Sequence, residues 1–174
     1  MARIFNFIDG LARLSAYLAA GLIVGIAALI LAEIFSRAVL NLSLSFAWEY
    51  AAYFMGAAVF LAAAFTLRYG GHVRVSLLSS SVPARMAKAI DMAATLFAAA
   101  IAVYVAYALL AFAWQAHVSG STSPTIDEVP LVYPRGVMAI GALLLAVQMI
   151  ARALQNLMSL PPEDAEARRI FGVE

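Results

Sequence analysis

The chain has 174 residues, of which 65% are apolar and 12% charged, and its mean hydropathy is +0.93. Soluble globular domains contain about 45–50% apolar and about 25% charged residues, so this composition excludes an ordinary soluble domain. A net charge of +1 gives no field that would attract nucleic acid, and the absence of cysteine excludes disulfides, thiol catalysis and thiolate metal sites.

The first segment, from Arg3 to Arg13, has its polar residues at positions 3, 6, 9, 10 and 13. These positions share one helical face, and the other face is apolar, which predicts an amphipathic helix lying in the membrane interface and running into the first span. It is not interpreted as a secretory signal, because the apolar stretch exceeds the roughly 7–15 residues of a signal core and no soluble domain follows.

Four apolar segments are each long enough to cross a hydrocarbon core of about 30 Å, which takes about 20 helical residues. The predicted spans cover about residues 14–34, 49–67, 90–115 and 131–151. Each span must satisfy its backbone groups internally as a helix. The sequence therefore predicts an all-α integral membrane protein with one four-helix domain over residues 1–160 and a short cytoplasmic tail over residues 161–174.

The eleven Lys and Arg residues are unevenly divided between the segments that flank the spans. Nine lie in the N-terminal arm, between spans 2 and 3, and after span 4: Arg3, Arg13, Arg68, Arg74, Arg85, Lys88, Arg152, Arg168 and Arg169. Only Arg37 and Arg135 lie on the opposite side. Because cytoplasmic segments carry the excess of positive charge, both termini and the middle loop are predicted to be cytoplasmic.

A charge cluster is expected at the outer ends of the spans. Glu33 and Arg37 are four residues apart, in the order that favours a helical ion pair. Glu49 opens span 2 on the same side, where a carboxylate suits a helix N-terminus, and Arg135 lies near the start of span 4. Two interpretations stay open: a structural ion-pair cluster with a snorkelling Arg135, or a role in partner docking, anion contact or ion handling.

The span interiors lack the features of a transport or catalytic site. No span has a charged residue near its centre, a Gly or Pro break at mid-depth, or an obvious repeat in the other half of the chain, whereas secondary transporters usually build their sites from broken, repeated helices. There is no nucleophile–base set, metal motif or phosphate loop, so we expect no enzyme, no metal site and no cofactor. His72 and His117 are predicted on opposite faces of the membrane, too far apart to ligate one haem.

Small residues at four-residue spacing indicate close helix packing. Gly21 and Gly25 form such a pair in span 1, and alanines recur at 94, 98, 102 and 106 in span 3, with Ala98 and Ala102 at its centre. This pattern fits packing within the four-helix domain, or alternatively a contact face for a second membrane subunit.

The segment Arg-Tyr-Gly-Gly-His-Val-Arg-Val-Ser-Leu-Leu, residues 68–78, resembles the signature loop of a known family. That family is the small membrane subunit, DctQ-like, of tripartite ATP-independent periplasmic (TRAP) transporters. The segments 33–37 and 47–49 and the prolines before span 4 are also similar to the family's pattern, while Ser76 and Arg135 depart from it. The motif residues that the resemblance makes available to a partner or to lipid are Arg68, Gly70, Gly71, His72 and Arg74.

The resemblance implies a bacterial inner-membrane protein that acts as a scaffold for a large, multi-span subunit. That subunit would carry the substrate and Na⁺ sites, and a soluble periplasmic binding protein would deliver an organic acid such as a dicarboxylate or a sialic-acid-like compound. Two other hypotheses remain: a membrane anchor for haem or quinone in a redox complex, and a self-sufficient homodimeric exporter that would use Glu33 or Glu49.

Overall fold

The computed structural model describes residues 2–68 and 83–157. Its helices are α1 (Ala2–Phe35), the π-helical turn η1 (Ser36–Leu40), α2 (Phe46–Arg68), α4 (Ala84–Ser119) and α5 (Val132–Leu157). The four α-helices are each long and apolar enough to cross a membrane. The predicted all-α class with four spans is therefore confirmed.

The helices are longer than the predicted spans because the sequence contains few signals that stop a helix. α4 begins directly after Pro83 and ends only at Gly120, whose φ of 60° is a left-handed conformation that glycine adopts readily. The N-terminal segment also continues without interruption, since α1 is one helix from Ala2 to Phe35. No separate interfacial helix is present in the described part of this segment.

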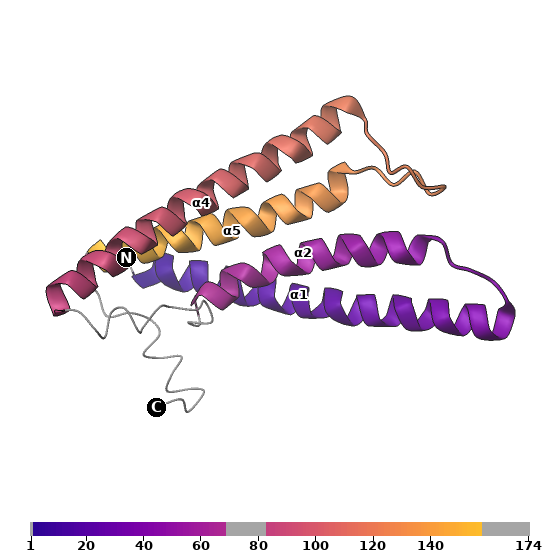
Figure 1. The fold of residues 1–174 in the computed structure, drawn as a ribbon, viewed down its shortest axis with the longest axis horizontal. Helices are drawn as coiled ribbons and strands as arrows, with labels where there is room; N and C mark the ends of the chain where they lie inside the picture. The colour runs from indigo at the N-terminus through magenta and orange to yellow at the C-terminus, as the bar shows by residue number, and fades with distance from the viewer. Residues whose placement is uncertain (1, 69–82, 158–174) are drawn as a thin grey trace.

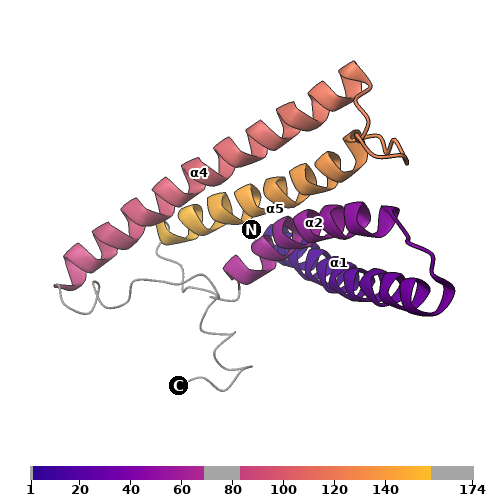
Figure 2. The same ribbon diagram turned by 45° about the vertical axis from the view of Figure 1, so that its right-hand side comes forward.

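The helices lie side by side in a row, in the order α1, α2, α5, α4 (Figures 1 and 2). α1 packs on α2, α2 on α5, and α5 on α4, while α1 and α5 share only a small contact. The loops 41–45 and 120–131 lie at one end of the row, here named the loop end (Figure 1). The start of α1, the end of α2, the start of α4 and the end of α5 lie at the opposite end.

The two middle helices, α2 and α5, meet at a seam where their backbones approach closely. A methyl group at Gly141 would lie 2.7 Å from the carbonyl carbon of Phe60 and 2.8 Å from the amide nitrogen of Leu61. A Cβ at Gly56 of α2 would likewise collide with the Met138 side chain of α5. Because no real Cβ fits at such distances, only glycine at position 141 allows this approach.

The small residues singled out in the sequence have different surroundings. A Cβ at Gly25 would lie 3.3 Å from the Phe54 ring, whereas a Cβ at Gly21 would meet no atom within 4 Å. On α4, Ala102 is buried in the core with α5 and Ala98 is half-buried. Gly25, Ala98 and Ala102 thus lie at or beside contacts within the chain, while Gly21 is exposed on the outer edge of the row.

Candidate functional site

Glu33 is the centre of a polar network at the loop end. It is 6% exposed, and its Oε1 accepts hydrogen bonds from the Nε of Arg37 at 3.2 Å and the Oγ of Ser43 at 3.1 Å. Its Oε2 accepts a hydrogen bond of 2.5 Å from the backbone N–H of Leu44. Arg37 also forms a salt bridge to Glu33 through Nη2, while its side chain remains 63% exposed. One carboxylate therefore fixes the α1–α2 loop and holds a positive charge at the surface of this end.

The π-helical turn η1 carries the chain from α1 into that loop. Ser36 donates its hydroxyl to the carbonyl of Leu42 at 3.0 Å and accepts, at its own carbonyl, the backbone N–H groups of Asn41 and Leu42. Asn41 has a φ of 54°, the left-handed conformation that ends many helices. This turn brings Ser43 and Leu44 back within reach of Glu33.

An open groove of about 460 Å³ adjoins this network, between the end of α1 and the start of α2. Six of its lining residues are apolar and two are the ion pair: Ile30, Ile34, Ala38, Ala47, Trp48 and Ala51, with Glu33 and Arg37. Trp48 is 74% exposed, as expected of a tryptophan in the aromatic belt of a membrane interface.

Glu49 takes part in a second network, which joins the two helical hairpins. It accepts hydrogen bonds from the hydroxyl of Tyr53, one turn along α2, and from the hydroxyl of Thr125 in the α4–α5 loop. Ser123, which is 4% exposed, bonds Thr125 at 2.6 Å and holds the backbone of that loop through Val129. Glu49 is therefore a link between α2 and a loop 76 residues further along the chain.

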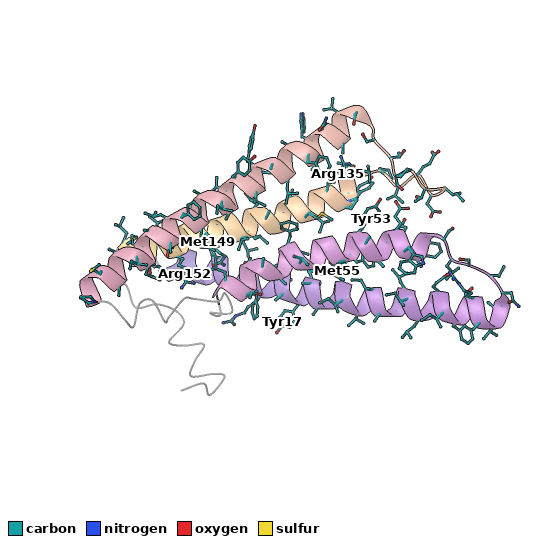
Figure 3. All side chains as sticks on the ribbon, in the orientation of Figure 1. Tyr17, Tyr53, Met55, Arg135, Met149 and Arg152 are labelled. Carbon is teal, nitrogen blue, oxygen red and sulfur yellow. The ribbon has the colours of Figure 1, made fainter. Side chains whose placement is uncertain are left out.

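Arg135, in the first turn of α5, lies against α4. Its guanidinium carbon is 3.6 Å from the centroid of the Phe112 ring, which is a cation–π contact. Figure 3 shows Arg135 and Tyr53 near the loop end. Of the four charged residues expected to cluster here, the structure thus joins Glu33 and Arg37 directly, while Glu49 and Arg135 have their own partners.

A third polar network lies at the opposite end and was not anticipated from the sequence. α5 carries three polar residues at four-residue spacing, and each bonds a different helix. The Nε2 of Gln148 donates to the carbonyl of Ile8 in α1 at 3.2 Å, and Arg152 donates to the carbonyl of Leu67 in α2 at 3.4 Å. Figure 3 shows Arg152 at this end of the row.

The last of the three, Asn156, donates to the carboxylate of Asp91 and the hydroxyl of Thr95 in α4, both at 3.2 Å. We name Gln148, Arg152 and Asn156 the α5 polar ladder. Their spacing, in a span otherwise poor in polar residues, is the signal that could have revealed it.

The loop motif lies largely outside the described residues. Arg68 is the last residue of α2, but its side chain and the residues Gly70, Gly71, His72 and Arg74 are not described. Their predicted contact with a partner or with lipid therefore stays a prediction. Among the residues that are described, no group of three or more His, Cys, Asp or Glu side chains is close enough to hold a metal ion.

The fold and these networks define a multi-pass helical membrane protein whose polar contacts gather at the two ends of its helices. The family model of the DctQ component of tripartite ATP-independent periplasmic transporters matches residues 26–158, which is most of the chain. The chain therefore belongs to this family. No curated protein matches it.

Membership fixes the class of function. The chain is the small permease subunit of a TRAP transporter, a multi-pass membrane protein of a bacterial three-component system, and it is not an enzyme. It works with the other two components of that system. The redox-anchor and self-sufficient exporter hypotheses are thereby set aside, because a component of a tripartite transporter is neither.

Proposed function

We propose that this chain is the membrane scaffold of a Na⁺-coupled transporter for an organic acid. A large multi-span membrane subunit carries the substrate and Na⁺ sites, and a soluble periplasmic binding protein delivers the acid. The observation that carries the proposal is the distribution of polar contacts in a chain of this family. They tie the helices together at both ends, and between them Gly141 of α5 packs against the backbone of Phe60 and Leu61 in α2.

The proposed topology places both termini in the cytoplasm. Nine of the eleven Lys and Arg residues flank the spans on the side of the termini, and the outer side holds Arg37 and Arg135. In this orientation the loop end faces the periplasm, and the start of α1 lies on the cytoplasmic side. The motif Arg68–Arg74 then contacts lipid or the large subunit from the cytoplasmic side.

The loop end is proposed to receive the binding protein. Arg37 has an exposed side chain on η1, and Arg135 lies over Phe112 at the start of α5. The Glu49–Thr125 bond holds the α4–α5 loop against α2, so a docking protein would meet a pre-arranged surface. Charge reversal at Arg37 or Arg135 should slow uptake at limiting binding protein and leave complex assembly intact. Unchanged uptake after both reversals would contradict this docking role.

The scaffold role is tested by reconstitution. Proteoliposomes with the large subunit, this chain, the binding protein and an inward Na⁺ gradient should accumulate the organic acid. Proteoliposomes with this chain and the binding protein alone should accumulate none. Full uptake by this chain without the large subunit would show that it is the carrier itself, and uptake that is independent of Na⁺ would remove the coupling ion from the proposal.

A further inference from the structure

α4 forms one edge of the helix row and exposes one face along its length. It packs on α5 through small buried residues, Ala102 and Ala106. On its open side lies a groove of about 500 Å³, lined by Ala99, Ala100, Val103, Tyr104 and Tyr107. The two tyrosines are 70% and 68% exposed.

These tyrosines lie at the depth of the hydrocarbon core. With a rise of about 1.5 Å per residue, Tyr104 is about 20 Å along the axis from Asp91 near one end of α4, and Tyr107 is about 15 Å from His117 near the other. Side chains on a helix lean toward its N-terminus, so Tyr107 leans away from the nearer end. Neither hydroxyl can therefore reach the water interface of a core about 30 Å thick.

The two hydroxyls make no hydrogen bond within the described residues, and both stand on the open side of α4. Two other polar side chains of the spans do have partners within the chain: Thr95 bonds the carbonyl of Asp91, and Tyr53 bonds Glu49. A hydroxyl that faces lipid tails without a partner costs free energy, because hydrocarbon offers no acceptor. In the described part of the chain, the exposed face of α4 therefore lacks hydrogen-bond acceptors for these two hydroxyls.

We propose that a transmembrane helix of the large subunit packs in this groove and accepts hydrogen bonds from Tyr104 and Tyr107. Ala99, Ala100 and Val103 leave room for the close approach that membrane helices use, and the hydroxyls require acceptors such as a Ser or Thr oxygen, a carboxylate or a free carbonyl. The proposal rests on the proposed function, since it names the face of the scaffold that meets its membrane partner.

The absence of cysteine from the chain permits a direct test by single-cysteine photolabelling. Ala100→Cys carries a benzophenone maleimide into the groove, and Ala20→Cys, an exposed alanine at mid-depth on α1, is the matched control. In membranes that contain the tagged large subunit, the label at 100 should cross-link to that subunit and the label at 20 should not. Cross-linking at 100 only to a second copy of this chain, only to lipid, or to the large subunit equally from both positions would overturn the proposal.

The hydrogen bonds are tested by removing the hydroxyls alone. The double variant Tyr104→Phe and Tyr107→Phe should weaken the complex by about threefold per hydroxyl, the usual worth of an interhelical hydrogen bond in a membrane. Tyr17→Phe, which removes an exposed hydroxyl from α1, should leave the complex unchanged. The measurement is the fraction of this chain retained on the tagged large subunit through a detergent wash series.

The outcomes separate this inference from the scaffold role. If the unmodified chain is not retained by the large subunit, the proposed function fails. A second variant, Ala100→Leu, places a larger side chain in the groove. If the unmodified chain is retained, and the double tyrosine variant and Ala100→Leu are retained equally well, only the α4 docking face is wrong. The melting temperature of the chain alone should not fall in the double variant, because the hydroxyls bond nothing within the described residues.

Discussion

The middle of the helix row and its two edges are built differently. At the middle, Gly141 of α5 packs against the backbone of Phe60 in α2. The polar ladder of α5 also bonds each of the three remaining α-helices, α1, α2 and α4. At the edges, α1 and α4 bury one face and leave the other open, as the exposed side chains of Tyr17 and Tyr104 illustrate.

This difference separates two tasks within one small protein. The seam and the ladder hold the row together, so their loss should be felt by the chain alone. The open faces of α1 and α4 lie outside the seam and the ladder, and the α4 face is the one proposed to meet the large subunit. Substitutions at the middle and at the edges should therefore differ in what they damage.

The largest effect is expected at the seam. Gly141→Ala places a methyl group 2.7 Å from a backbone carbon of α2, which forces the two helices apart and should lower the free energy of unfolding by about 1–3 kcal/mol. Gly21→Ala adds the same methyl group to α1 in open space and should stabilise the chain by about 0.5–1 kcal/mol through helix propensity. Unfolding of both variants in mixed detergent micelles measures the contrast, and equal stabilities would remove the distinction between middle and edge.

The polar ladder should come second. Gln148 is 6% exposed, and Gln148→Ala removes its hydrogen bond to the Ile8 carbonyl, the contact that ties α5 to α1, which we expect to cost about 1–2 kcal/mol of stability. Gln115→Ala, at an exposed position on α4, is the control and should stay within about 0.5 kcal/mol of the unmodified chain. Faster hydrogen exchange at the start of α1 in the Gln148 variant alone would locate the loss.

The far end of the ladder should contribute less. Asn156 is partly exposed, and Asn156→Ala removes its hydrogen bonds to Asp91 and Thr95, at an expected cost of about 0.5–1.5 kcal/mol. Thr95 keeps its own bond to the Asp91 carbonyl, so α4 should remain helical there. A double-mutant cycle with Thr95→Val measures the coupling between the helices. A coupling of zero would mean that Asn156 does not hold α4 to α5.

Some of this arrangement could be predicted from the sequence and some could not, for a physical reason. The spans follow from apolar length, and the Glu33–Arg37 pair follows from its spacing within one helix turn, because both are local properties. The seam does not, since lipid-facing and protein-facing residues of a span are equally apolar and hydropathy does not separate them. Gly21 and Gly25 formed the visible motif, yet the close approach to another helix's backbone is at Gly141, which stands in no such pair.

The same limit applies to the charged residues. The carboxylate of Glu49 was expected near the outer end of span 2, but its bond to Thr125 joins positions 76 residues apart and depends on how the hairpins pack. Two of the ladder contacts are longer still in sequence, 85 residues for Arg152 and Leu67 and 140 residues for Gln148 and Ile8. Local pairs can be predicted from spacing, whereas partners on other helices require the packing to be known.

The smallest effect is expected where an edge helix meets the loop end. Arg135→Met keeps an apolar stem over Phe112 and removes the charge, so it should cost about 0.5–1 kcal/mol, the worth of an exposed cation–π contact. If Arg135 also docks the binding protein, the same variant should slow uptake at low salt far more than it lowers stability, because charges at a docking surface act mainly on the association rate. Uptake and unfolding measured on one preparation distinguish these roles: a matched small loss in both would confine Arg135 to holding α5 against α4.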